Sequence, residues 1–100
     1  MIKVFISGKM TGEPNYNREK FFDVERELTE EGDMIVLNPA VLPDGLKHEE
    51  YMLICLSMID VCDMVIMLDG WEKSKGAVLE RNHAVANNKV VDEWKEWYQL

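Results

Sequence analysis

Residues 64–68 read Met-Val-Ile-Met-Leu and form a continuous apolar run. A strand that is apolar on both faces is typical of the centre of a parallel sheet covered by helices on both sides. The run stops at Asp69-Gly70, where a polar loop begins. We therefore predict a central strand over residues 64–68 and an α/β fold built around it.

The segments on either side of this strand alternate between short apolar runs and stretches with helical spacing. The apolar runs predict strands at residues 2–6 and 34–37 and a short edge strand at 89–91. Helices are predicted from position 16 or 17 to 31, from 48 through 59 and from 77 to 86, followed by a short helix or tail over 92–100. This alternation predicts one domain over residues 1–100, a small doubly wound, flavodoxin-like or Rossmann-like three-layer sandwich with a four- to five-stranded parallel sheet.

Ligands of such sheets bind outside the carboxyl ends of the strands, where the strand order reverses. The loops at that edge begin at Ser7, Asn38 and Asp69. We expect the working site to lie among these three loops.

The net charge of −8 and a pI of about 4.7 exclude bulk nucleic-acid binding, which depends on Lys and Arg displacing counterions. A single nucleotide remains possible, because backbone N–H groups can hold one phosphate inside an acidic protein. No apolar run reaches the ~18 residues that a membrane span needs, so we expect no membrane partner and a cytoplasmic location.

The cysteines and histidines show no metal-binding pattern. Cys55 and Cys62 are not in a CxxC arrangement, and His48 and His83 are not spaced as a metal pair. We predict two reduced thiols, no metal and no cofactor.

The loop over residues 7–12 reads Ser-Gly-Lys-Met-Thr-Gly and follows the first strand directly. Gly8 and Gly12 permit a close backbone approach to a ligand, while Ser7 offers a hydroxyl and Lys9 a charge. A tight turn without any ligand explains the glycines equally well. The loop matches neither the dinucleotide fingerprint nor the P-loop.

The loop over residues 71–76 leads into a predicted helix that carries a more informative pattern. Ser74 lies near the helix start, where free N–H groups favour anions. Glu80 lies six residues later and shares a face with Ala77 and Ala84. A carboxylate on a face of small residues beside a strand-end cleft is a candidate functional group, although most glutamates on helices are simply solvated.

Several short motifs extend this pattern along nearly the whole chain: Ile6 to Gly12, Tyr16-Asn17, Asn38-Pro39, Tyr51-Met52, Asp63, Gly70-Trp71, Ser74, Gly76-Ala77 and Glu80. Together they resemble the nucleoside 2-deoxyribosyltransferase-like superfamily. Within it, the chain is most similar to the short phage and prophage branch known as DUF4406.

The resemblance implies an enzyme that attacks the N-glycosidic bond of a nucleoside or nucleoside monophosphate. Glu80 matches the nucleophile, which forms a glycosyl-enzyme ester that a second base or water resolves. Ser74 matches the serine that helps to hold the 5′-phosphate in related N-glycosidases. The other residues expected to contact substrate are Ser7, Gly8, Lys9, Met10, Tyr16, Asn38, Asp69, Gly70, Trp71 and Gly76.

The chain departs from the family pattern at two positions. Cys55 stands where the family usually has an aspartate that orients the substrate, and Gly8-Lys9 replaces the usual Gly-Pro. Because partner-subunit residues complete the site in the transferases, the resemblance also implies a homo-oligomer.

Two alternatives remain open at this point. The first is a catalytically lapsed nucleotide-binding module, which Cys55 favours. The second is a receiver or flavodoxin-like domain, although a receiver needs acids where Ser7-Gly8 stands.

Overall fold

The computed structural model describes residues 1–94, and four strands in them form one sheet. The strands are β1 (Ile2–Ser7), β2 (Met34–Leu37), β3 (Met64–Met67) and β4 (Val90–Glu93). All neighbouring strands are parallel and lie in the order β2-β1-β3-β4. The predicted parallel sheet is confirmed, with β3 in its interior.

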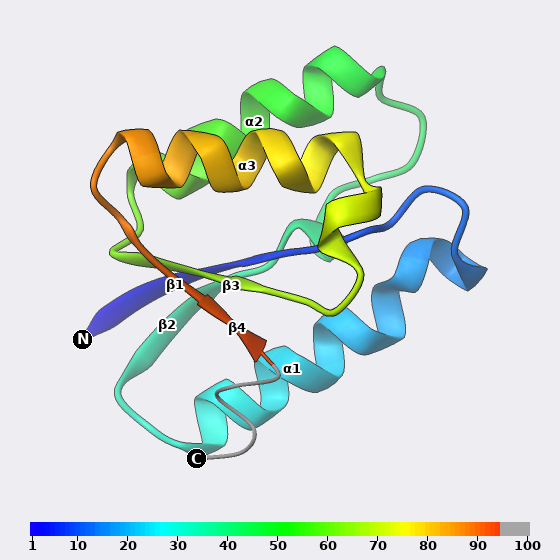
Figure 1. Cartoon of the computed structure of the whole chain (residues 1–100). Coiled ribbons are helices and arrows are strands. Elements are labelled where there is room, and N and C mark those ends of the chain that lie inside the picture. Colours follow the sequence, from blue (N-terminus) through cyan, green and yellow to red (C-terminus); the bar gives the residue numbers. More distant parts are fainter. Residues whose placement is uncertain (95–100) are drawn as a thin grey trace.

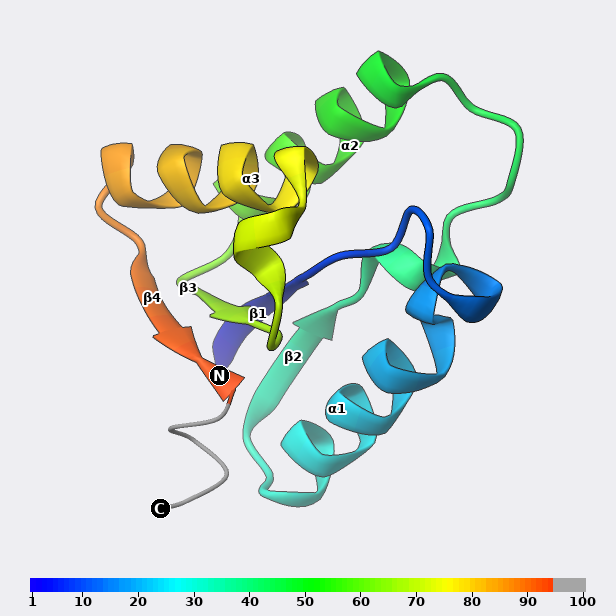
Figure 2. The same ribbon diagram turned by 45° about the vertical axis from the view of Figure 1, so that its right-hand side comes forward.

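The three helices are α1 (Arg18–Glu30), α2 (His48–Asp60) and α3 (Lys75–Ala86). Short 3-10 turns occur at η1 (Pro14–Asn17), η2 (Pro39–Val41) and η3 (Trp71–Lys73). As Figures 1 and 2 show, α1 covers one face of the sheet, and α2 and α3 cover the other. The expected three-layer, doubly wound architecture is confirmed.

Each face of the sheet has its own hydrophobic cluster, because successive strand residues point to opposite sides. Buried side chains from α1 and from β1 and β3 form most of the first cluster: Val4, Ile6, Phe21, Val24, Leu28, Met64 and Ile66, together with Leu68, which follows β3, and Ala40. Those from α2, α3 and the same two strands form most of the second: Phe5, Cys55, Ile59, Val65, Met67, Ala77 and Ala84, together with Cys62. Both central strands are therefore apolar on both faces.

Several element boundaries differ from the predictions by one or two residues; the central strand, for example, ends at Met67 instead of 68. The first helix begins at Arg18, because Asn15, Tyr16 and Asn17 have the positive φ angles of 49°, 55° and 62°. The third begins at Lys75 instead of 77, because Ser74 is its N-cap.

At the C-terminal end, the edge strand extends to Glu93, so residues 92 and 93 are strand where a helix or tail was expected. The rest of that segment from position 95, including Trp97, lies outside the described residues.

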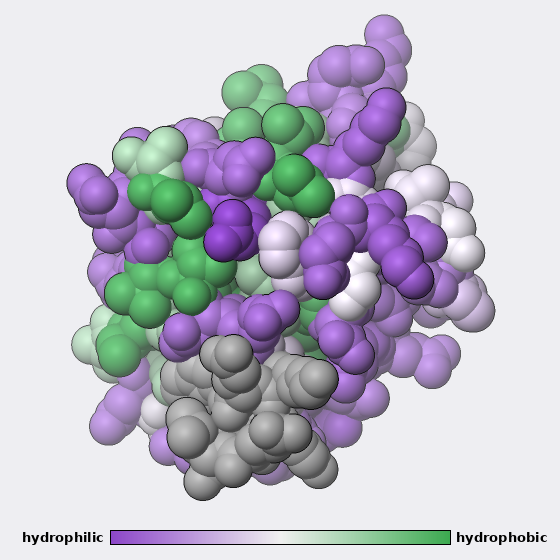
Figure 3. Space-filling model, in the orientation of Figure 1, coloured by the Kyte–Doolittle hydropathy of each residue, from purple (hydrophilic) through white to green (hydrophobic). Residues whose placement is uncertain are grey.

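The strand order reverses between β1 and β3, since β2 lies on one side of β1 and β3 on the other. The chain is tightly packed there: a Cβ atom on Gly8 would lie 2.8 Å from the Cβ of Leu68. Within residues 1–94, no helix is long and apolar enough to cross a membrane. Hydrophobic side chains do gather on one outer surface near α3 and β4 (Figure 3), where Leu79, Val85 and Val90 are exposed.

Candidate active site

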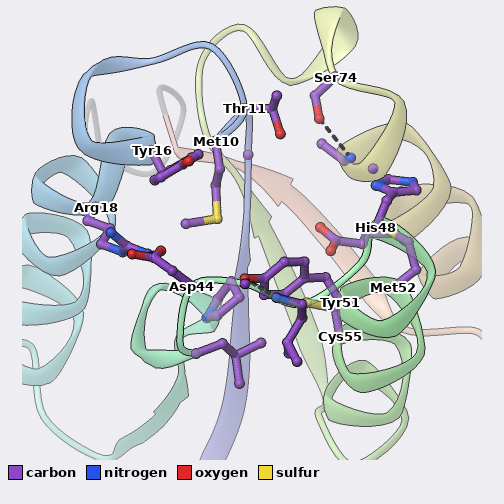
Figure 4. A pocket seen from close by; sticks show the side chains of 18 residues that line it. Met10, Thr11, Tyr16, Arg18, Asp44, His48, Tyr51, Met52, Cys55 and Ser74 are labelled. Atoms are coloured by element: carbon purple, nitrogen blue, oxygen red, sulfur yellow. Dashed lines mark hydrogen bonds and ion pairs between the residues drawn. The ribbon is translucent and has the colours of Figure 1, made fainter.

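A cavity of about 480 Å³ opens at the carboxyl edge of the sheet, where the strand order reverses (Figure 4). This volume lies in the range of roughly 300–1,000 Å³ that is typical of small-molecule sites. The walls come from the loop after β1, the segment from η2 into α2, and the start of α3. The structure brings six of the predicted site residues to it: Gly8, Met10, Tyr16, Ser74, Gly76 and Glu80.

Glu80 lines the cavity with a buried carboxylate that is only 7% exposed. The hydroxyl of Ser7, itself fully buried at the end of β1, donates a hydrogen bond of 2.6 Å to Oε1 of Glu80. Ala77, Glu80 and Ala84 are the buried residues of α3, so the shared face expected from their spacing is confirmed. A carboxylate is thus fixed at the junction of β1 and α3.

Burial raises the pKa of Glu80 to about 7, since desolvation disfavours the charged form. Hydrogen bonds from Ser7 and, to a smaller extent, Cys55 act in the opposite direction and lower this pKa. Glu80 therefore exchanges a proton close to neutral pH, which suits a group that takes part in chemistry.

The two cysteines are buried and free. Burial first, and then the charge of Glu80, raises the pKa of Cys55, so this residue stays a neutral thiol beside the carboxylate. Burial likewise raises the pKa of Cys62 to about 11. Neither thiol is activated as a nucleophile.

Ser74 and His48 lie on one side of the cavity, at the first turns of two helices (Figure 4). The Oγ of Ser74 accepts a hydrogen bond of 3.1 Å from the N–H of Ala77, which leaves its own hydrogen to donate. His48 lies close to the start of α3, because a Cβ atom on Gly76 would be 3.8 Å from the His48 Cε1 atom and 3.9 Å from the Ser74 Oγ atom. The positive ends of both helix dipoles make this side favourable for an anion.

Arg18 and Asp44 form an ion pair on the other side of the cavity (Figure 4). The guanidinium also donates to Oδ1 of Asn15 at 3.2 Å and lies 5.1 Å from the centre of the Tyr16 ring. Figure 4 shows Tyr16 and Met10 along the same side. This wall combines an aromatic ring with paired charges.

Tyr51 holds the loop that carries Asp44. Its hydroxyl donates to the carbonyl of Pro43 at 2.6 Å and accepts from the N–H of Leu46 at 3.3 Å. The loop between η2 and α2 is thereby held against α2, which contributes Tyr51, Met52 and Cys55 to the cavity lining.

The other predicted site residues do not line the cavity: Ser7, Lys9, Asn38, Asp69, Gly70 and Trp71. Ser7 acts through Glu80, as described above. Asn38 is buried and structural, because it caps η2 through the N–H of Ala40 and donates to Glu25. Asp69 is exposed, and it does not point into the cleft as expected.

Lys9 and Trp71 also have contacts outside the cavity. The carbonyl of Lys9 accepts from Nδ2 of Asn17 at 3.0 Å. The indole of Trp71 donates to Glu93 at 3.1 Å and lies 5.2 Å from the Arg81 guanidinium. These contacts give both residues a role in holding the loops.

The family described as Domain of unknown function (DUF4406) matches residues 2–92. The chain belongs to the DUF4406 family. No curated protein matches its sequence. Among solved structures, it is similar to a 2-desoxiribosyltransferase from Leishmania mexicana, with a TM-score of 0.72 and 22% identity over 93% of this chain.

The DUF4406 chain spans 63% of the length of that protein. Because the similarity covers nearly all of this chain, the chain has a nucleoside 2-deoxyribosyltransferase-like fold, as the sequence motifs implied.

Sequence reasoning missed several cavity residues of this DUF4406 protein, notably Arg18, Asp44 and His48. One signal could have indicated them. The segment after Leu37 starts at the carboxyl edge of the sheet, so residues 40–48, which continue it, can be expected to contribute to a site there. Within residues 1–94, no group of three or more His, Cys, Asp or Glu side chains could hold a metal ion.

Proposed function

We propose that the protein cleaves the N-glycosidic bond of a nucleoside or a nucleoside monophosphate, with Glu80 as the nucleophile. One observation carries this proposal: a buried carboxylate, held by Ser7, lines a cavity of nucleoside size. The nucleoside 2-deoxyribosyltransferase-like fold and the DUF4406 match over residues 2–92, a range that includes Glu80, support it.

The reaction takes two steps. In the first, a carboxylate oxygen of ionised Glu80 attacks the anomeric carbon, the bond to the base nitrogen breaks, and the base leaves with the electron pair and gains a proton. This forms a glycosyl-enzyme ester. In the second, water or another base attacks the same carbon, the bond from that carbon to the Glu80 oxygen breaks and its electron pair stays on the carboxylate, and the attacking group releases a proton to solvent.

Ser74 and His48 would receive the 5′ end of the substrate. Glu80 lies six positions after the N-cap Ser74, a rise of about 9 Å along α3, which leaves room for a sugar and its 5′ substituent between them. The Ser74 hydroxyl and the first turns of α2 and α3 are suited to a phosphate there. A monophosphate should therefore bind more tightly than the matching nucleoside.

A second candidate is a nucleotide-binding module without turnover. The observation that favours it is the neutral thiol of Cys55 beside Glu80, at a position where the family usually has a substrate-orienting aspartate. Such a module would keep the cavity and its anion side but release no base.

The decisive experiment is base release from a panel of deoxynucleosides and their 5′-monophosphates, measured by chromatography. We expect release by the unaltered protein and a loss of roughly 10⁴-fold or more in both Glu80→Ala and Glu80→Gln. Glu72→Gln is the matched control, because Glu72 is an exposed acid just before the same helix. Release that persists without Glu80 would refute the mechanism, and saturable binding without release would support the module.

A homo-oligomer is also part of this proposal. Leu79 and Val85 on α3 and Val90 on β4 support it, since each exposes an apolar side chain that a second copy could cover. Sedimentation velocity at micromolar concentration measures the oligomeric state directly, and a monomer at all concentrations would refute the proposed homo-oligomer.

A further inference from the structure

The cavity wall formed by Tyr16, Arg18 and Asp44 has no role in the steps described so far. Arg18 is the first residue of α1, and Asp44 lies between η2 and α2, so their ion pair joins two segments across the cavity. The Arg18 side chain is 22% exposed, and the Asp44 side chain is 70% exposed. The pair therefore has one shielded donor group and one open acceptor.

The segment before Arg18 holds an aromatic ring at the cavity in an unfavourable backbone conformation. Asn15, Tyr16 and Asn17 are consecutive residues with positive φ, which L-residues rarely adopt and which persists only where other contacts hold it. Asn17 supplies such a contact through the carbonyl of Lys9, and the guanidinium of Arg18 lies against the Tyr16 ring. Tyr16 is nevertheless 50% exposed, so ring surface is available to a ligand.

This wall is the side of the cavity that the proposed reaction leaves for the base. The inference rests on the proposed function, in which Glu80 meets the anomeric carbon and Ser74 receives the 5′ end. The base then projects away from Ser74, and Figure 4 shows Arg18, Asp44 and Tyr16 on the side opposite Ser74.

We propose that Tyr16 and Arg18 form the nucleobase subsite, and that Arg18, oriented by Asp44, selects 6-oxopurines such as guanine and hypoxanthine over adenine. The Tyr16 ring supplies a stacking surface, which is tolerant of base identity. Discrimination comes from Arg18, which is only a donor and presents its N–H groups as a planar fork.

The base edges explain the direction of the selection. A 6-oxopurine presents two neighbouring acceptors, O6 and N7, which match the guanidinium fork, whereas adenine presents an amino donor at position 6. Asp44 and Asn15 engage Nη2 and Nη1 once each, so further N–H groups of Arg18 remain for a base. Asp44 is a positioning residue, because it fixes the plane of the fork.

The test compares the binding of 2′-deoxyinosine and 2′-deoxyadenosine, which have nearly the same shape, by calorimetry on the Glu80→Gln protein so that turnover does not interfere. We expect deoxyinosine to bind about tenfold more tightly or better. Arg18→Met and Arg18→Lys should each bring the ratio close to one, because neither keeps the fork. Asp44→Asn should lower it, and Asp44→Glu should retain most of it.

Arg26→Met is the matched control, since Arg26 forms a 2.8 Å pair with Asp23 on the same helix but does not line the cavity. It should leave the ratio unchanged. Three results would overturn the proposal: equal affinities for the two nucleosides in the Glu80→Gln protein, no binding of either nucleoside, or an affinity ratio that is unchanged in both Arg18 variants.

Base release by protein with Glu80 intact separates this inference from the proposed function. Selective binding without base release would support the proposed subsite and refute the proposed catalysis. Base release from both nucleosides with equal kcat/KM would support the catalysis and refute the base selection.

Discussion

Glu80 combines burial with a charge that forms near neutral pH. Its carboxylate accepts hydrogen bonds from the side chains of Ser7 and Cys55. Ionisation of Glu80 lowers the stability of the folded protein, because the ionised form needed for attack is the one that burial disfavours.

We predict that this loss of stability appears in the pH dependence of the unfolding free energy. The folded pKa of Glu80, about 7, is above its usual value of 4.5, so between these values the folded chain holds a proton that the unfolded chain has lost. The stabilising contribution is therefore complete below about pH 4.5 and is lost as the pH rises through 7. The shift corresponds to about 3 kcal/mol at most.

Urea unfolding at pH 5 and pH 8 measures this effect. The difference in unfolding free energy between Glu80→Gln and the parent should grow in favour of the variant as the pH rises. A difference that is the same at both values would show that Glu80 titrates normally.

Gly8 is expected to be essential for packing, whatever its role toward a ligand. Gly8→Ala would bring a Cβ within 2.8 Å of the Cβ of Leu68, which cannot rotate away. We expect a loss of about 1–3 kcal/mol in unfolding free energy. Gly76→Ala is the matched control, because its nearest neighbour is the flexible Met52 sulfur at 3.4 Å, so this variant should be at least as stable as the parent.

At the scale of the element, α3 brings the proposed nucleophile and the anion side of the cavity together in one rigid helix. Its N-cap, Ser74, ends the polar loop after β3, and its buried face carries Glu80. The helix therefore sets the spacing between the two ends of a bound substrate, while Ser7 at the end of β1 holds the Glu80 carboxylate through its hydrogen bond.

The two roles of Ser74 can be separated by substitution. Ser74→Ala should cost about 1 kcal/mol of stability through the lost cap. Ser74→Asp should keep the stability, since aspartate caps well and its charge suits the helix N-terminus. The same charge should repel a substrate phosphate, so Ser74→Asp should weaken monophosphate binding at least tenfold while changing nucleoside binding little.

Titration calorimetry with one nucleoside and its monophosphate, alongside urea unfolding, checks this prediction. Equal losses for both ligands in Ser74→Asp would mean that the phosphate binds elsewhere.

At the scale of the whole molecule, the net charge of −8 limits the partners. We predict no saturable binding of duplex DNA near 0.15 M salt, because the protein lacks the excess of Lys and Arg that releases counterions. Fluorescence anisotropy of a labelled duplex measures it. Saturable binding that weakens steeply with added salt would contradict this prediction.

Much of the fold could be predicted because its signals are local. The apolar runs at residues 2–6, 34–37 and 64–68 predicted three strands, and the carboxyl-edge rule predicted the edge of the sheet at which the cavity opens. The helix start at Arg18 was predicted too early, because the left-handed turn before it depends on contacts such as that between Asn17 and Lys9.

The site was predictable only in part, for the same reason. Glu80 and Ser7 are 73 positions apart, yet both follow from strand ends and helical spacing. Arg18 and Asp44 are 26 positions apart, one at the start of α1 and the other in an irregular loop, and no periodic pattern connects them. Lys9, Asp69 and Trp71 occur in the expected loops but are not among the residues that line the cavity.

The sequence by itself determined the layered α/β architecture, the edge that carries the site and the carboxylate at position 80. These follow from side-chain periodicity and from chain geometry within a few residues. Only the tertiary structure decided that Glu80 is buried against Ser7 and Cys55, and that Arg18 meets Asp44 across the cavity. Burial and long-range pairing arise when distant segments pack together, so no local pattern encodes them.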